Sequence, residues 1–230
     1  AGNTNQAGED CRNVARFASL LAGMPTEVGG LTVNRLCASG LAATLHAANS
    51  VKIGEGDLFV AGGVESMSRA PLVLSKAQGA YDRGQSLADS TLGARFTNPA
   101  FASGYGNDTM PQTADNIAAD VDISRADSDS FAAASQAKYE AARADGFFQE
   151  EIAETEVPQG RKKPPITVAA DEHPRPQTSV ESLTGLRSLF EGGVVTAGNA
   201  SGINDGAASL IVGSREIGER HGVKPRARII

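Results

Sequence analysis

The chain has 230 residues, of which 40% are hydrophobic and 21% charged, with 26 glycines and a formal net charge of −6. This composition fits an α/β protein with a sizeable core, and the acidic balance argues against nucleic acid as the main partner. No apolar run is long enough to span a bilayer, and two cysteines with three scattered histidines predict neither a disulfide framework nor a metal site. We therefore expect a cytoplasmic protein with no membrane or nucleic-acid partner.

The first part of the chain predicts a short α/β unit. Residues 1–10 are polar and predict a loop, and residues 13–22 predict a helix. Residues 31–36 predict a strand, residues 38–53 a helix and residues 57–61 a second strand. Strand, helix and strand in this order indicate a βαβ unit, so the two strands should run parallel.

Cys37 lies at the turn between the predicted strand and helix, in the run Asn-Arg-Leu-Cys-Ala-Ser-Gly. The unpaired N–H groups and positive partial charge of a helix N-terminus favour a thiolate, which is the nucleophilic form of cysteine. Ala38, Ser39 and Gly40 are small and leave room for a substrate to approach. From this pattern alone, Cys37 is either a nucleophile or one more small buried hydrophobe.

The middle of the chain is rich in loops. Residues 62–71 predict a glycine-containing loop, and residues 72–105 show no dominant period and predict irregular structure with short helical turns. Residues 113–120 predict a short helix. A Ser-x-x-Asp capping box then opens the strongest helix of the chain, over residues 125–144.

The last third predicts a return to α/β structure. Residues 151–157 and 166–169 predict two strands around a basic turn, and residues 179–186 predict a short helix. Residues 207–212 predict a buried strand, followed by a helix over 214–221.

Residues 197–202 are small and predict a loop that either presses against a ligand or makes a tight structural turn. The loop-rich residues 71–189 interrupt the α/β pattern, so they predict an inserted lid-like subdomain. Residues 1–70 and 190–230 would then form one α/β domain.

Four runs, in family order, closely resemble the thiolases, the acyltransferases that make or cleave 3-oxoacyl-CoA. They are Asn-Gln-Ala-Gly, Asn-Arg-Leu-Cys-Ala-Ser-Gly, Gly-Gly-Val-Glu-Ser-Met-Ser and Thr-Ala-Gly-Asn-Ala-Ser-Gly-Ile-Asn-Asp-Gly-Ala. Asn-Gln-Ala-Gly-Glu-Asp, Val-Glu-Ser-Met-Ser-Arg-Ala-Pro and Asp-Glu-His-Pro-Arg-Pro look most like the degradative β-ketoadipyl-CoA thiolases of aromatic-compound breakdown. The resemblance implies the N-terminal α/β half of the thiolase fold, a mixed sheet with helices, carrying a loop subdomain.

The resemblance also implies roles for particular residues, beginning with Cys37, which falls on the family's acylated nucleophile. Six further residues fall on positions that contact CoA or line the acyl pocket: Arg175 near the adenine end, Ser182, the pantetheine-loop residues Ala197, Gly198 and Ser201, and Met110 in the acyl pocket. Some thiolases have a CoA-contacting histidine just before the methionine, whereas this chain has Thr109, which weakens the expectation of that contact. CoA is implied as a substrate, with no bound cofactor.

Three catalytic segments of the family do not occur in this sequence: the Gly-His-Pro base, the Cys-x-Gly second cysteine and Asn-Glu-Ala-Phe at the oxyanion hole. They belong to the family's C-terminal domain, which we expect to lie outside this chain, and Cys11 lies in the wrong segment to replace the second cysteine. The resemblance therefore implies that the partners are CoA and acyl-CoA thioesters and that the complete protein forms a homodimer or homotetramer. It also implies that this fragment alone is inactive. Two alternatives stay open: a β-ketoacyl synthase-type condensing enzyme, and a non-catalytic acyl-CoA- or lipid-binding relative.

Overall fold

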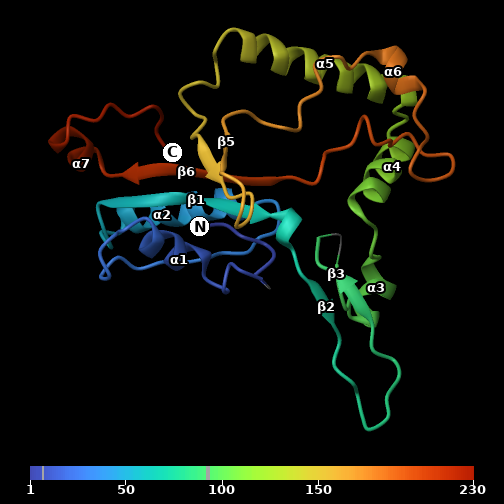
Figure 1. Cartoon of the computed structure of the whole chain (residues 1–230), viewed down its shortest axis with the longest axis horizontal. Coiled ribbons are helices and arrows are strands. Elements are labelled where there is room, and N and C mark those ends of the chain that lie inside the picture. The colour runs from blue at the N-terminus through green and yellow to red at the C-terminus, as the bar shows by residue number, and fades with distance from the viewer. Residues whose placement is uncertain (7, 92–93) are drawn as a thin grey trace. The chain divides into compact units, whose positions relative to one another are not determined.

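A computed structural model describes residues 1–6, 8–91 and 94–230 (Figure 1). Ala7, within the Asn-Gln-Ala-Gly run, lies outside the described residues, as do Leu92 and Gly93 in the segment expected to be irregular. The chain divides into two compact units. We call residues 1–98 with 203–230 the sheet unit, and residues 99–202 the helical unit.

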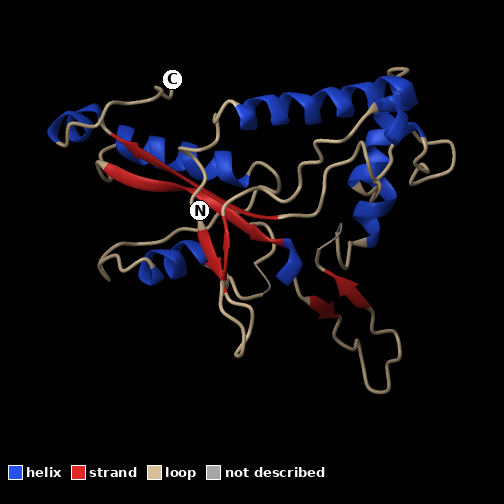
Figure 2. Cartoon of the chain, turned by 45° about the horizontal axis from the view of Figure 1, so that its top comes forward, coloured by secondary structure: helices blue, strands red, loops and turns tan. Residues whose placement is uncertain are grey.

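The sheet unit is built on two long antiparallel strands, β1 (Leu58–Ser66) and β6 (Asp205–Gly213), which lie side by side in Figure 2. Their register runs from Leu58 opposite Gly213 to Ser66 opposite Asp205, so every residue of each strand is paired. The prediction that β1 ends at residue 61 was wrong. Because β6 supplies ladder partners to Gly62 and the residues after it, the strand continues through a stretch expected to be a loop.

The expected pairing of two βαβ strands was also wrong. Residues 31–36 form no extended strand, and Val33 is held instead by an isolated parallel bridge to Gly2. Gly2 makes a second parallel bridge to Gly63, and its N–H donates to the Gly62 carbonyl at 2.7 Å. The start of the chain, expected to be a loop, therefore lies between the 31–36 segment and β1.

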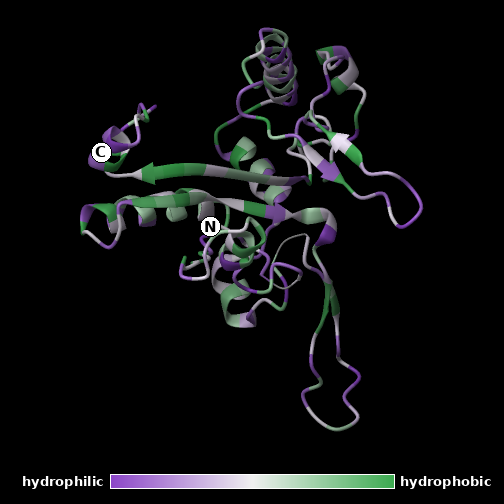
Figure 3. Cartoon of the chain, turned by 60° about the vertical axis from the view of Figure 1, so that its left-hand side comes forward, coloured by the Kyte–Doolittle hydropathy of each residue, from purple (hydrophilic) through white to green (hydrophobic). Residues whose placement is uncertain are grey.

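Two helices of the sheet unit lie close to their predicted positions: α1 (Val14–Leu21) and α2 (Ser39–Lys52). Helix α2 packs against β1 and β6, and its buried Ala43 and Ala47 face a core that includes Ala61 of β1. Small alanine side chains let a helix approach a sheet closely. Figure 3 colours the first half of β1 and the end of β6 as hydrophobic, where Ala61 pairs with Leu210.

A hairpin replaces part of the predicted irregular region. Strands β2 (Leu72–Leu74) and β3 (Leu87–Asp89) pair antiparallel, and the 3₁₀ turn η1 (Met67–Arg69) precedes them. The Asn5 amide donates to the Ser90 hydroxyl at 3.0 Å, which ties the end of the hairpin to the beginning of the chain. These contacts place the hairpin in the sheet unit, so the units divide at 99–202 and not at the expected 71–189.

The helical unit contains the best-predicted element, α5 (Arg125–Ala144), whose bounds match the prediction. The predicted capping box is present, because the Ser124 hydroxyl accepts from the Asp127 N–H at 3.1 Å. The other helices of this unit are α3 (Pro99–Tyr105), α4 (Met110–Asp120) and α6 (Val180–Thr184). Helix α4 begins earlier than predicted because Thr109 and Gln112 form a second capping box.

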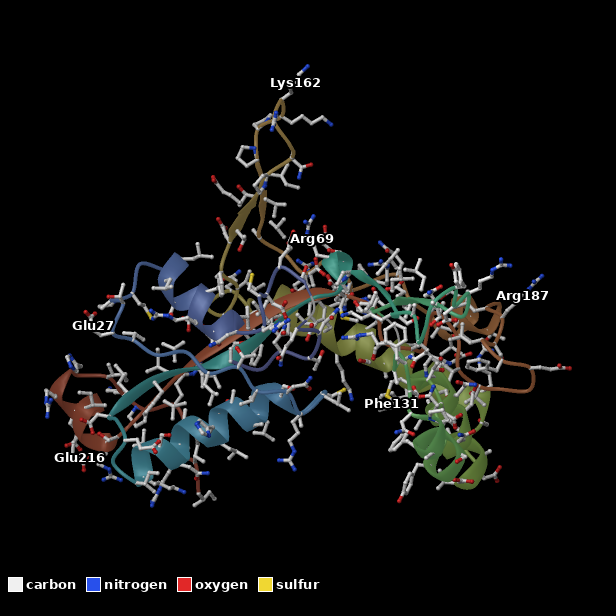
Figure 4. All side chains as sticks on the ribbon, turned by 90° about the horizontal axis from the view of Figure 1, so that it is seen from below. Glu27, Arg69, Phe131, Lys162, Arg187 and Glu216 are labelled. Atoms are coloured by element: carbon white, nitrogen blue, oxygen red, sulfur yellow. The ribbon has the colours of Figure 1, made fainter. Side chains whose placement is uncertain are left out.

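Strands β4 (Thr155–Val157) and β5 (Ile166–Val168) form the predicted pair, although both are shorter than expected. Their pairing is antiparallel, and Figure 4 shows Lys162 at the tip of the connecting loop, directed away from the ribbon. In the sheet unit, β6 is followed by α7 (Arg215–Arg220), as predicted. Within the described ranges, no helix combines the length and the apolar character needed to cross a membrane.

The close approach of β1 and β6 gives a direct test of this register. A Cβ added at Gly62 would overlap the carbonyl oxygen of Ala208 on β6. We expect Gly62→Ala to destabilise the full-length protein by roughly 1–3 kcal/mol, because overpacking forces the strands apart. The thermal unfolding midpoint should fall by several degrees. Gly206→Ala is the matched control, because no atom lies within 4 Å of its added Cβ; equal midpoints for the two variants would contradict the register.

Candidate active site

Cys37 occupies the place that the sequence predicted, immediately before Ala38, the N-cap of α2. Its side chain is exposed, so a reagent or substrate can reach the thiol. The residue before it, Leu36, has a φ of 51°, a left-handed conformation that costs a non-glycine residue on the order of 1 kcal/mol or more. Such a conformation persists only where surrounding contacts hold it, and these contacts define the turn around Cys37.

Ser39 and Asn34 hold Leu36 from both sides. Ser39 is only 4% exposed, and its hydroxyl accepts from the Arg35 N–H at 2.8 Å and donates to the Leu36 carbonyl at 2.6 Å. The Asn34 side-chain oxygen accepts from the Leu36 N–H at 3.0 Å. Both backbone polar groups of Leu36 are therefore bonded, and Ser39 closes the turn across Cys37.

Glu65, near the end of β1, supports the same turn from outside. Its carboxylate accepts from the N–H and hydroxyl of Thr4, at 2.8 and 2.7 Å, and from the Asn5 N–H at 3.1 Å. The Thr4 carbonyl in turn accepts from the Asn34 amide at 3.0 Å. A continuous set of hydrogen bonds thus connects β1 to the Cys37 turn. Sequence analysis did not single out Glu65, because its partners lie some sixty positions away.

The other six predicted site residues all belong to the helical unit, whereas Cys37 belongs to the sheet unit. Arg175 lies in the exposed loop before α6, where its Nη1 donates to the carbonyls of Glu172 and His173 at 2.7 and 2.8 Å. Ser182 is exposed on α6, and its hydroxyl donates to the Ser179 carbonyl at 2.8 Å. Both side chains are therefore at the surface and oriented by local hydrogen bonds.

The small-residue loop packs directly against α6. A Cβ added at Gly198 would overlap the methyl groups of Leu183 and Leu186, so the glycine lets the loop lie close to these two side chains. Ala197 and Ser201 of the same loop are exposed. The structure thus brings the helix of Ser182 and the predicted pantetheine loop into contact.

Met110 opens α4 and is 68% exposed. Its helix is tied to the same region, because the Asp115 carboxylate accepts from the N–H groups of Val194 and Val195 at 2.7 and 3.0 Å. Thr109 serves as the N-cap of α4 and is engaged by Gln112. Met110, Ser182 and the 197–201 loop therefore lie on elements that contact one another. The Arg175 N–H donates to the side-chain oxygen of Gln136 at 2.9 Å, which connects the Arg175 loop to α5.

Two cavities lie within the helical unit. One, of about 320 Å³, is lined mainly by polar residues that include Asp108, Asp115 and Glu191. The other, of about 630 Å³, is lined by the stacked rings of Tyr139 and Phe148, with centroids 5.0 Å apart, and by prolines on either side of Arg175. Burial raises the pKa of the Tyr139 hydroxyl, and its hydrogen bond to Asp171 adds to the shift.

Metal-ligating side chains do not gather in the described part of the chain: no three His, Cys, Asp or Glu residues there are placed to hold an ion. The exposed Cys37 on a constrained turn at a helix start is typical of the class of enzymes that use a cysteine nucleophile. The comparisons with known proteins make this class specific.

The model of the thiolase N-terminal domain matches residues 1–216, and the chain belongs to this family. It is 54% identical over its whole length to the β-ketoadipyl-CoA thiolase of Pseudomonas putida, and it covers 57% of that protein. It is 52% identical to the 3-oxoadipyl-CoA/3-oxo-5,6-dehydrosuberyl-CoA thiolase of Escherichia coli K12, again covering 57% of the relative. The predicted resemblance is thereby confirmed, and the chain spans just over half the length of these relatives.

Solved structures agree with this assignment and with the predicted fold class. The acetyl-CoA acetyltransferase of Bacillus anthracis superposes with a TM-score of 0.86 at 34% identity, over 97% of this chain and 55% of that one. Human mitochondrial 3-ketoacyl-CoA thiolase in complex with CoA superposes with a TM-score of 0.82 at 34% identity, over 97% of this chain and 54% of that one. The chain therefore has the α/β fold of the N-terminal half of a thiolase.

Proposed function

We propose that the complete protein is a thiolase that cleaves a 3-oxoacyl-CoA with CoA, giving acetyl-CoA and a shortened acyl-CoA. The observation that carries the proposal is Cys37, exposed on a constrained turn at the start of α2 in a chain of this family. The names of the two relatives above favour a 3-oxoadipyl-CoA substrate. We place the reaction in β-ketoadipate or fatty-acid degradation. These matches support a degradative role more than a biosynthetic one.

The proposed chemistry has two halves. The Cys37 thiolate attacks the 3-oxo carbonyl carbon, the bond between C2 and C3 breaks, and C2 takes up a proton as acetyl-CoA leaves. The acyl group remains on Cys37 as a thioester until the thiolate of free CoA attacks it and releases Cys37. Backbone N–H groups at the start of α2 would help to stabilise the oxyanion that forms at each attack.

The helical unit would bind the CoA portion of both substrates. Ser182, Ala197, Gly198 and Ser201 lie on elements in contact, and Arg175 and Met110 are tied to the same unit by backbone and side-chain hydrogen bonds. CoA acts here as a substrate, so no bound cofactor is required. We further propose a cytoplasmic homodimer or homotetramer, for which light scattering of the full-length protein is the direct measurement.

The test is intact-mass analysis of the full-length protein after mixing with β-ketoadipyl-CoA or acetoacetyl-CoA. We expect one acyl group per chain, mapped to the peptide that contains Cys37 and lost when free CoA is added. Bound CoA without any adduct would support a non-catalytic acyl-CoA-binding relative instead. Transfer only from carrier-protein thioesters would support a condensing enzyme.

A further inference from the structure

The helical unit contains a nearly inaccessible carboxylate, Asp129, which is 1% exposed and lies near the start of the unit's long helix α5. Both of its oxygens are occupied: Oδ2 accepts from Arg125 Nε at 2.7 Å, and Oδ1 accepts from the Asn199 amide at 2.9 Å. A charge is retained in such a place only where it is paired and fully hydrogen-bonded. Asp129 is therefore the point at which α5 is joined to the loop carrying Asn199.

Asn199 connects Asp129 to the 197–201 loop, which is predicted to lie along the pantetheine arm of CoA. Its side-chain oxygen accepts from the Thr196 N–H at 2.7 Å, and its amide also donates to the Val194 carbonyl at 2.9 Å. Thr196 is fully buried, and its hydroxyl accepts from the Gly198 N–H at 3.2 Å. The backbone from 194 to 199 is thus shaped around one amide, which Asp129 holds in place.

Arg125 connects Asp129 to the end of helix α6. Its Nη2 donates to the carbonyls of Leu183 and Leu186 at 2.7 and 3.0 Å, at the end of the helix that carries Ser182. Leu183 is buried against Gly198. One carboxylate therefore fixes two elements relative to each other, the short helix α6 and the 197–201 loop.

We propose that Asp129 is a positioning residue for CoA, which sets the relative placement of α6 and the 197–201 loop without touching the ligand. This inference rests on the proposed function, because it assumes that Ser182, Ala197, Gly198 and Ser201 face CoA. Its physical basis is that each of these four residues lies on an element whose backbone is bonded to Arg125 or Asn199, and both of those side chains are oriented by Asp129.

The test compares CoA binding with thiol reactivity in full-length Asp129→Asn. An asparagine is the same size as Asp129, but it removes the negative charge that pairs with Arg125. We expect the Kd for CoA, measured by calorimetry, to rise about tenfold. The rate at which iodoacetamide alkylates Cys37 should stay within about twofold of wild type, because Cys37 belongs to the sheet unit.

Asp127→Asn is the matched control, because it makes the same chemical change on the same helix at an exposed residue whose side chain bonds to Ser124. Its Kd for CoA should equal that of wild type. Should Asp129→Asn fail to fold, Arg125→Lys keeps the charge but removes the forked donors to Leu183 and Leu186, and it should weaken CoA binding severalfold.

Two results would overturn the inference while leaving the proposed function intact. The first is an unchanged Kd for CoA in the folded variants. The second is an equal loss of CoA binding and of the rate of Cys37 alkylation, which would indicate a general structural role. Wild-type protein that neither binds CoA nor becomes acylated would overturn the proposed function and the inference together.

Discussion

Replacing Cys37 by alanine in the full-length protein is expected to abolish acyl transfer from 3-oxoacyl-CoA, by a factor of roughly 10⁴ or more. The thiolate forms the bond that holds the acyl group, and alanine has no atom that can replace it. Intact-mass analysis should show no adduct after mixing with substrate. CoA binding should persist, because the residues proposed to contact CoA belong to the helical unit.

Cys11→Ala is the control for this prediction, because Cys11 is the other cysteine of the chain and is likewise exposed. This variant should be acylated at the wild-type rate. An adduct on Cys37→Ala, or loss of the adduct in Cys11→Ala, would show that the nucleophile has been assigned to the wrong residue.

Ser39→Ala is expected to slow the acylation of Cys37 by roughly 10- to 100-fold with little change in KM. The substitution removes a buried hydroxyl that bonds to Arg35 and Leu36, so the Arg35 N–H loses its partner at a cost of about 1–3 kcal/mol. The left-handed backbone of Leu36 would then relax and displace Cys37, and small displacements of a reacting group are costly in rate. Rapid-mixing mass spectrometry measures the acylation rate directly.

Ser50→Ala separates this positioning effect from a loss of stability. Ser50 is as buried as Ser39, lies on the same helix α2, and donates its hydroxyl hydrogen bond to Glu55 at 2.7 Å, away from Cys37. Both variants should lower the unfolding midpoint by similar amounts. Only Ser39→Ala should slow acylation; equal acylation rates in the two variants would show that Ser39 has no role beyond folding.

Elements specified by neighbouring residues could be predicted closely from the sequence. Helix α5 has the predicted bounds because its capping box and its helix-forming residues act within a few positions of one another. The start of α2 was also predicted closely, from the alanine-rich segment that follows Cys37, although this helix has no side-chain cap. The Arg125–Asp129 pair also has helical i,i+4 spacing, a signal that could have been noticed but says nothing of its burial.

Elements specified by distant residues could not be predicted in this way. The extension of β1 depends on β6, which pairs with it from far along the chain, and the bridging position of Gly2 depends on two separate segments. Nothing in the local pattern of residues 62–66 distinguishes a paired strand from a glycine loop. The prediction of a loop there failed because hydrogen bonds to a partner strand, and not local preference, decided the conformation.

The sequence by itself determined the family, most of the helices and the place of Cys37 at the start of α2, since each depends on identity or spacing over a short stretch. Only the tertiary structure decided what holds those residues in position. Glu65 supports the Cys37 turn through partners sixty positions earlier, and Asp129 reaches Asn199 across seventy. Burial and hydrogen bonding between such distant residues are properties of the folded chain, because only folding brings their side chains within bonding distance.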